Sequence, residues 1–214
     1  MPEIRRNRRF YGPGPPTGKR VGAVRSEAPG RSGLEKIIRQ TERIAGLIRA
    51  LLDVARTDAG NAVPVDLPRV IDRAAEILRS MFPAATLELD LEPDLPPVWG
   101  YPRRLEHAVL NLMINGCQAM EGRGALRLSI GRIAAESTGL EMFVEDHGCG
   151  IAPENLERIF QPFFSTKVSG EGSGLGLSLV DRVIREIGGS IRVRSRPGST
   201  RFSIFLPTAE KKEA

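Results

Sequence analysis

The residues with the clearest chemical potential stand between positions 146 and 150. Asp146, Gly148 and Gly150 form a D-x-G-x-G turn directly after the apolar run LEMFVE, which predicts a buried strand. Because glycine lacks a Cβ, the turn can bend sharply and come close to a flat ligand. The neighbouring carboxylate can accept a hydrogen bond. The turn is therefore a candidate binding site for a planar group.

A second cluster, rich in glycine, opens a helix predicted from the segment LSLVDRVIREI. It consists of Gly172, Ser173, Gly174, Leu175, Gly176 and Leu177. Backbone N–H groups at the start of a helix favour anions such as phosphate. The preceding loop, STKVSGEG, has the composition of a mobile segment, and its Lys167 is either a phosphate contact or a solvated lysine.

Two other nucleotide motifs fail on single residues. The dinucleotide fingerprint G-x-G-x-x-G requires glycine where the chain has Leu177 or Leu179. A P-loop at Gly18-Lys19 fails because Pro13 stands at the first glycine position and Arg20 replaces Ser or Thr. The glycine clusters therefore need another explanation.

Two asparagines, Asn111 and Asn115, lie four residues apart within the apolar segment RRLEHAVLNLMINGCQAM. This spacing places both on one face of a helix. Buried amides need partners, so one interpretation is a pair satisfied by the protein itself. The alternative is a site for Mg²⁺, which takes oxygen ligands and retains waters and phosphates.

The elements that must position these residues follow from hydrophobic periodicity and turn signals. Asp66 is a predicted N-cap, with Pro68 in the first turn of its helix. Helices are predicted over 67–79, from about 102 to 120, and over 177–187, with a short helical segment after Gly150. Strands are predicted over 63–67, 86–91, 125–133, 140–145, 190–195 and 201–206, with Val98-Trp99-Gly100 leading into the helix from 102. The interleaved order predicts a helix layer on a mixed sheet, an α+β fold.

The first 60 residues have a different character. Residues 1–33 are dense in Arg, Gly and Pro and predict a disordered, solvated tail, while binding of nucleic acid by RRNRR is the less favoured alternative. Residues 34–56 have a 3-4 apolar alternation that predicts a long helix. That helix either packs on its own domain or, as we favour, associates with a second chain.

Composition excludes several classes of protein. Of the 214 residues, 41% are hydrophobic, which is enough to form a core. The formal net charge of +5 resides in the N-terminal tail, since residues 1–33 contribute eight basic and two acidic side chains. Cys117 and Cys149 form no metal or disulfide motif. The absence of a long apolar run or secretion signal predicts a cytoplasmic protein with no membrane span.

Taken together, the motifs resemble the ATP-binding catalytic domain of sensor histidine kinases of two-component systems. The resemblance rests on the order of N-L-x-x-N, D-x-G-x-G, F-x-P-F-F-S-T-K and G-S-G-L-G-L, and it covers residues 61–208. It implies the Bergerat-type α/β sandwich of the GHKL superfamily, with a mixed, mostly antiparallel sheet. Residues 34–60 resemble the second helix of the dimerisation hairpin in these kinases, and residues 209–214 are a C-terminal tail.

The resemblance also implies roles for individual residues. Asn115 would supply an oxygen to Mg²⁺ and Asn111 would support the phosphates of ATP. Asp146 would accept a hydrogen bond from the adenine amine, and Thr200 would lie near the base. The remaining nucleotide contacts would come from Gly148, Gly150, Gly172, Gly174, Leu175, Gly176 and Leu177. Residues 165–173 would form a mobile lid.

Two departures from the family pattern shape the functional prediction. The hairpin's phosphoacceptor histidine is absent, since the two histidines are His107 and His147. Asn111 occupies the position where ATPase relatives have a glutamate that deprotonates water, so slow hydrolysis is expected. Tyr101 stands where an aspartate commonly caps the helix that carries Asn111.

We therefore predict a protein histidine kinase that transfers the γ-phosphoryl of ATP to a histidine on another chain. Its partners would be a histidine-containing hairpin, a response regulator, and a homodimeric or heterodimeric copy bound through residues 34–56. A degenerate module that binds ATP without transferring phosphate is the first alternative. A serine kinase or ATPase of the same superfamily is the second.

Overall fold

The computed structural model describes residues 61–133, 139–167 and 173–208. The predictions for residues 1–33, 34–56 and 209–214 lie outside the described residues. The helices are α2 (Leu67–Met81), α3 (Pro102–Ala119), η1 (Pro153–Asn155) and α4 (Gly176–Glu186). The strands are β1 (Val63–Val65), β2 (Ala85–Leu91), β3 (Val98–Gly100), β4 (Gly124–Arg132), β5 (Gly139–Asp146), β6 (Ser190–Arg196) and β7 (Ser199–Pro207).

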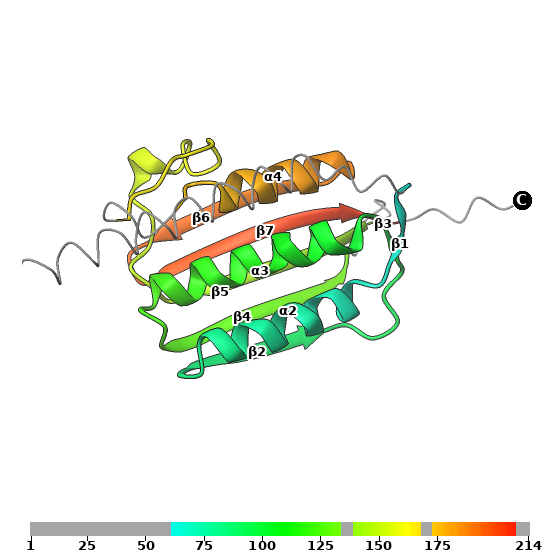
Figure 1. The fold of residues 1–214 in the computed structure, drawn as a ribbon, viewed down its shortest axis with the longest axis horizontal. Helices are drawn as coiled ribbons and strands as arrows, with labels where there is room; N and C mark the ends of the chain where they lie inside the picture. The colour runs from blue at the N-terminus through cyan, green and yellow to red at the C-terminus, as the bar shows by residue number, and fades with distance from the viewer. Residues whose placement is uncertain (1–60, 134–138, 168–172, 209–214) are drawn as a thin grey trace, which may run out of the picture.

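Within the described ranges, the main sheet has five strands in the order β2-β4-β5-β7-β6. β2 and β4 are parallel, whereas the other three neighbouring pairs are antiparallel. A two-stranded antiparallel sheet joins β1 to β3. Helices α2, α3 and α4 lie side by side on one face of the main sheet (Figure 1). This arrangement confirms the predicted α+β fold with a mixed, mostly antiparallel sheet.

The start of α2 shows how a local signal sets an element boundary. The Asp66 side chain accepts a hydrogen bond from the Arg69 N–H at 3.3 Å, and Pro68 occupies the first turn. The predicted strand over 63–67 was therefore too long, because Asp66 and Leu67 already belong to the helix start. The ends of the other predicted helices and strands differ from the observed ones by at most two residues. The helical segment expected after Gly150 is a single 3₁₀ turn, η1.

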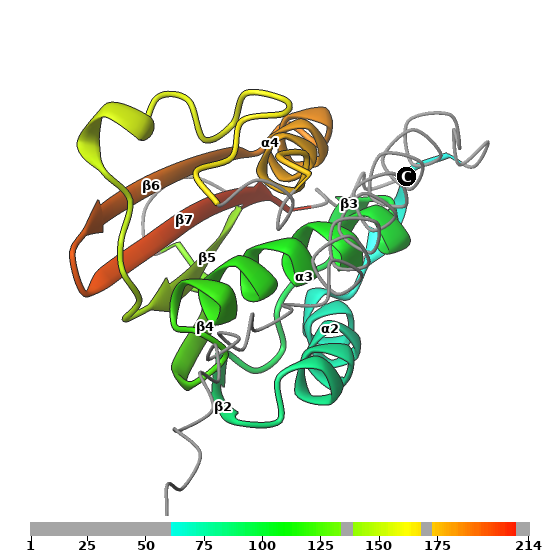
Figure 2. The ribbon, with the colours of Figure 1, turned by 60° about the vertical axis from the view of Figure 1, so that its left-hand side comes forward.

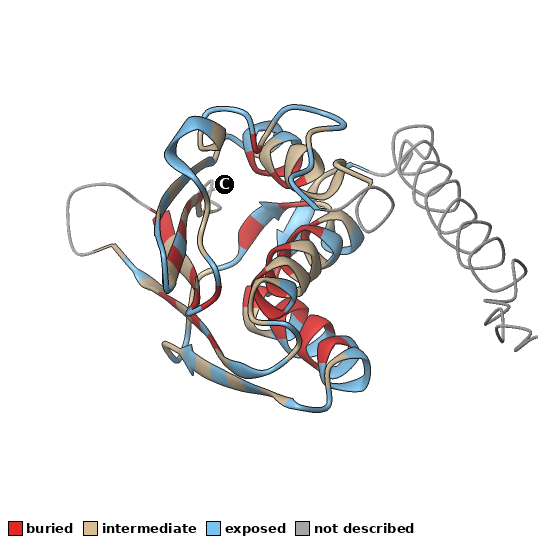
Figure 3. Cartoon of the chain, turned by 90° about the vertical axis from the view of Figure 1, so that its left-hand side faces the viewer, coloured by how far each residue is buried: buried red, intermediate tan, exposed pale blue. Residues whose placement is uncertain are grey.

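The hydrophobic core fills the space between the helix layer and the sheet. Buried side chains concentrate on the sides of α2, α3 and α4 that face the sheet (Figure 3). Strand β7 alternates strictly between buried and partly or fully exposed residues, so one of its faces meets the helices. Strand β2, at the sheet edge, alternates between partly buried and exposed residues, as predicted.

Helix α3 is the central helix of the layer, and it packs against both α2 and α4 (Figures 1 and 2). It approaches the sheet closely at Gly116, where an added Cβ would stand 2.5 Å from Leu126 Cδ1 and 3.4 Å from Asp146 Cβ. A larger residue at this position would force the Leu126 side chain to move. Gly116 therefore brings the asparagine-bearing helix close to the end of β5.

Candidate functional site

A cavity of about 660 Å³ lies along α3, between the end of β5, the start of β7 and the start of α4. It contains most of the residues singled out from the sequence: Asn111, Asn115, Asp146, Gly150, Lys167, Gly174, Gly176, Leu177 and Thr200. Gly148 and Leu175 are described but do not line the cavity, and Gly172 lies outside the described residues. Residues more than 80 positions apart in the chain thus form one site.

Asp146 is one of the two buried polar side chains in the described part of the chain, with an exposed fraction of 4%. Its Oδ1 accepts a hydrogen bond from the Gly148 N–H at 2.9 Å. Burial raises the pKa of this carboxyl, although the hydrogen bond from Gly148 and the nearby His147 act in the opposite direction. A carboxylate held in this way gains from a further hydrogen-bond donor, such as a ligand amine.

Thr200 is the second of these residues, with an exposed fraction of 3%. It stands directly opposite Asp146 in the antiparallel pairing of β5 and β7. The site therefore has a buried carboxylate and a buried hydroxyl directly opposite each other on neighbouring strands. The sequence places these residues 54 positions apart, and only the strand pairing brings them together.

The glycines of the D-x-G-x-G turn pack against the protein's own backbone. A Cβ at Gly148 would stand 2.5 Å from the Ala119 carbonyl at the end of α3. A Cβ at Gly150 would stand 2.5 Å from the Arg196 oxygen, and Gly150 also has a left-handed φ of +78°. The turn is thus held between α3 and the β6–β7 hairpin, where the Gly198 N–H donates to the Gly148 oxygen at 3.1 Å.

Asn111 and Asn115 both face the cavity from α3, as their spacing predicted. Their side chains are partly exposed, and no side-chain hydrogen bond of either asparagine occurs among the described residues. The structure therefore does not contain the protein-satisfied pair considered from the sequence. Two amide oxygens remain available to a ligand or a hydrated cation.

The N-terminus of α4 meets α3 at Asn111. A Cβ at Gly176, the first residue of α4, would stand 3.2 Å from Asn111 Oδ1. The N-cap residue Leu175 makes no side-chain hydrogen bond to the helix. The N-cap residue therefore leaves the first-turn N–H groups of this 11-residue helix without a side-chain cap at the edge of the cavity. Such N–H groups favour the binding of an anion.

Described residues between η1 and α4 form a wall of the cavity, among them Phe164, Lys167 and Gly174. Phe163 is 69% exposed and has a φ of +67°, which is unusual for a residue other than glycine. Gly174, with a φ of +68°, lies so close that a Cβ there would be 2.4 Å from the Phe163 carbonyl carbon. Lys167 Nζ donates a hydrogen bond to Gln118 Oε1 at the end of α3. The wall is thus attached to α3 and to the start of α4.

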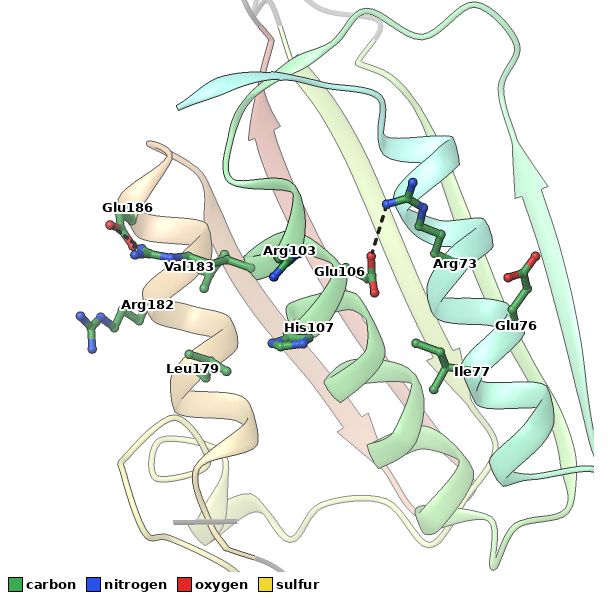
Figure 4. A pocket seen from close by; sticks show the side chains of 11 residues that line it. Arg73, Glu76, Ile77, Arg103, Glu106, His107, Leu179, Arg182, Val183 and Glu186 are labelled. Carbon is green, nitrogen blue, oxygen red and sulfur yellow. Dashed lines mark hydrogen bonds and ion pairs between the residues drawn. The ribbon is translucent and has the colours of Figure 1, made fainter. Parts of the chain in front are cut away.

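A second cavity, of about 570 Å³, lies on the outer side of the helix layer. Figure 4 shows Arg103 and His107 on α3, between residues of α2 and α4. The Arg104 guanidinium donates from Nη1 to both Glu186 carboxylate oxygens, at 2.9 and 2.8 Å, and stacks over the Tyr101 ring. Tyr101 itself makes no side-chain cap for α3. None of the predicted site residues that the structure describes lines this second cavity.

Sequence reasoning missed several residues of the first cavity. Gln118 and Cys149 line it, and Gly116 lets α3 approach Asp146. A glycine inside an apolar helix was the available signal for Gly116. Cys149 occupies a variable position of the D-x-G-x-G motif, and nothing local marked Gln118, because its position depends on how α3 meets the turn. Both cysteines are free thiols; Cys117 is buried and Cys149 is exposed.

The fold and the cavity together define a nucleotide-binding α+β domain, and the comparisons with known proteins agree. Residues 100–210 match the family model described as histidine kinase-, DNA gyrase B-, and HSP90-like ATPase. The chain belongs to this family and contains the ATP-binding catalytic domain of a sensor histidine kinase. Within the described residues, no helix is both long and apolar enough to cross a membrane.

Three similar proteins illustrate the relationship. The sensory histidine kinase/phosphatase NtrB of Rhodobacter capsulatus is 34% identical over 207 residues, which are 89% of this chain and 58% of that protein. The structure of the mycobacterial sensor histidine kinase MprB is 30% identical, with a TM-score of 0.60, and covers 69% of this chain and 97% of its own. Full-length ShkA in complex with AMPPNP is 25% identical, with a TM-score of 0.65, and covers 84% and 39%. The chain spans just over half the length of NtrB.

Proposed function

We propose that residues 61–208 bind ATP with Mg²⁺ and transfer its γ-phosphoryl to a histidine on a separate dimerisation hairpin. The observation that carries this proposal is the order of groups along α3. Gly116 brings the helix against Asp146, and Asn111 lies against Gly176 at the start of α4. Asn111 and Gly116 are five positions apart, which is about 7.5 Å along the helix axis and suits a nucleotide with its base at one end and its phosphates at the other.

The two ends of the cavity suit the two ends of ATP. At the base end, the Asp146 carboxylate accepts a hydrogen bond from the exocyclic amine of adenine, and Thr200 lies beside it. At the phosphate end, the N–H groups of Gly176 and Leu177 bind phosphate oxygens, with Gly174 and Leu175 directly before them in the chain. Gly148 and Gly150 act indirectly, because they hold the turn that carries Asp146.

The asparagine pair gives the phosphate end its cation site. Asn115 offers an amide oxygen to Mg²⁺, and Asn111 supports the phosphates beside it. A magnesium ion bound here would neutralise charge on the phosphates. Lys167 adds a positive charge to the wall formed by 164–167, at hydrogen-bonding distance from Gln118. These residues contribute to catalysis by positioning and by compensating charge.

The reaction favoured at this site is transfer to nitrogen rather than to water. In transfer, the bond between the γ-phosphorus and its bridging oxygen breaks while a bond forms to an imidazole nitrogen. A neutral imidazole nitrogen has a lone pair and needs no base, whereas water must lose a proton. Asn111, at the position of the general base in the ATPase relatives, cannot accept that proton. We therefore expect slow hydrolysis when no hairpin is present.

A two-stage experiment tests this proposal. Calorimetry first compares ATP binding by the wild type and Asn115→Ala, with and without Mg²⁺. The loss of the amide should remove most of the Mg²⁺-dependent gain in affinity and leave the Mg²⁺-independent part unchanged. Transfer of labelled γ-phosphate to the histidine hairpin of the related NtrB, and to the same hairpin without its histidine, follows in the same samples.

The outcomes separate the candidate functions. Labelling of the intact hairpin alone supports a kinase that acts in trans. ATP binding without labelling, with NtrB's own catalytic domain labelling the hairpin in parallel, supports a module that only binds nucleotide. Rapid phosphate release without any hairpin would contradict the role assigned to Asn111. Failure to bind ATP would contradict the whole proposal.

A further inference from the structure

Ser195, on β6, does not line the cavity, yet its hydroxyl connects two parts of the cavity wall. The Ile151 N–H donates a hydrogen bond to Ser195 Oγ at 2.8 Å. Ser195 Oγ also lies 2.8 Å from Thr200 Oγ1 and 3.5 Å from the Ser199 oxygen. Both Ile151 and Thr200 line the cavity, so this one hydroxyl links the segment after Gly150 to the start of β7.

Counting protons assigns a direction to the bond between the two hydroxyls. A serine hydroxyl has one proton and two acceptor lone pairs. One lone pair accepts from Ile151, so the proton goes either to Thr200 Oγ1 or to the Ser199 oxygen. The distance of 3.5 Å is too long for a good O–H···O bond, whereas 2.8 Å is ideal. Ser195 therefore donates to Thr200.

The proton of Thr200 is then directed away from Ser195 and is available in the cavity. Because Thr200 stands opposite Asp146 on the neighbouring strand, the cavity presents a donor next to an acceptor. Adenine has the complementary edge, with the N6 amine as donor beside N1 as acceptor. Guanine has the reverse pattern at these positions, since O6 accepts and N1–H donates.

We propose that Ser195 is a positioning residue that sets Thr200 as a hydrogen-bond donor and thereby makes the site selective for adenine over guanine. This inference rests on the proposed binding of ATP with its base beside Asp146. Without the Ser195 hydroxyl, the Thr200 hydroxyl is free to rotate and can either donate or accept. The preference for adenine then weakens, although Asp146 is untouched.

The test measures the ratio of ATP to GTP affinity by competition against a fluorescent nucleotide in the full chain. Ser195→Ala should lower this ratio roughly five- to tenfold, the scale of one hydrogen bond. Ser195→Thr keeps the hydroxyl and should retain the wild-type ratio. Thr200→Val should lower the ratio by itself, and adding Ser195→Ala to it should produce no further change. Ser203→Ala, on the same hairpin, is the matched control and should have no effect.

Two results would overturn the inference. One is an equal loss of ATP and GTP affinity in Ser195→Ala, because that is the result expected for a purely structural role. The other is a further change of ratio when Ser195→Ala is added to Thr200→Val. Failure of the proposed function looks different, since Asp146→Asn and Thr200→Val would then leave ATP affinity unchanged. If Ser195→Ala does not fold, a reduced ratio in Ser195→Thr would contradict the inference.

Discussion

The two cavities beside α3 have similar volumes, about 660 and 570 Å³, but they differ in the number and pairing of the charged side chains that line them. The outer cavity is rich in charged side chains, and the fold pairs several of them. Arg104 bonds both oxygens of Glu186, and Arg73 lies 4.0 Å from Glu106. Among the described residues, the inner cavity has a single carboxylate, Asp146, which accepts one hydrogen bond from the backbone.

This difference shows that the number of charges around a cavity is a poor guide to a ligand site. Ion pairs near the surface satisfy each other and contribute modestly to stability. A buried carboxylate without a cationic partner is costly, and proteins retain such groups mainly where a ligand uses them. We therefore place the proposed nucleotide site in the inner cavity, although the outer cavity has more charge.

Removing one carboxylate from each cavity is the sharpest test of this comparison. Asp146→Asn should weaken ATP binding about 100-fold, because a charged hydrogen bond to the base is replaced by a neutral amide. The melting temperature should stay the same or rise, since burial raises the pKa of Asp146 and so disfavours its charged form. Calorimetry and thermal denaturation measure the two effects.

Glu186→Gln is the matched change in the outer cavity. It should leave ATP affinity unchanged and lower the melting temperature slightly, because Arg104 loses its charged partner. If the two substitutions had the same effects on binding and stability, the contrast between the cavities would be wrong.

The pH dependence of ATP binding probes the same carboxylate without a substitution. Because burial raises the pKa of Asp146, this group protonates at a higher pH than an ordinary aspartate as the pH falls. Protonation removes the acceptor, so affinity should fall through that pH range. Over the pH range in which the protein stays folded, this decline in ATP affinity should be smaller than the loss of affinity caused by Asp146→Asn.

Titration of the ATP phosphates needs a control, and Asp146→Asn provides it. The phosphates titrate equally in both proteins, so the difference between the two pH profiles isolates the carboxylate. In addition, ATP binding to the wild type near the raised pKa should release protons, which calorimetry in two buffers detects. Parallel profiles for the two proteins would show that ionisation of Asp146 does not govern binding.

The smallest effect is expected in the outer cavity. Arg104→Gln breaks the ion pair with Glu186 and should reduce the free energy of unfolding by about 1 kcal/mol. ATP affinity should not change, because no described residue that is proposed to bind nucleotide lines this cavity. Urea denaturation and calorimetry provide the measurements. A loss of ATP affinity at unchanged stability would mean that the outer cavity is coupled to the site.

Much of the fold followed from local patterns in the sequence. Asp66 and Pro68 predicted the start of α2, and apolar alternation predicted the strands of the main sheet. The spacing of Asn111 and Asn115 placed both on one face of α3 because a helix repeats every 3.6 residues. The D-x-G-x-G motif after an apolar run correctly predicted a turn at the end of a buried strand.

Other features depended on contacts between distant segments. No pattern in the sequence indicated that β2 pairs in parallel with β4, or that β7 lies between β5 and β6. The sequence assigned Gly148 and Gly150 to a ligand but did not indicate that a Cβ at either position would also meet the backbone at Ala119 or Arg196. The ion pairs of the outer cavity could not be predicted from the sequence either, because each joins residues of two different helices.

The sequence by itself thus determined the helices, the strands, the turn chemistry and the presence of two sets of nucleotide-binding motifs. Those properties depend on residues a few positions apart, which share one face of a helix or one turn. Only the tertiary structure decided that Asp146 faces Thr200, that Ser195 bonds both Thr200 and Ile151, and that Gly176 meets Asn111. Strand register and helix packing determine these contacts, and both depend on how the side chains of the whole core pack together.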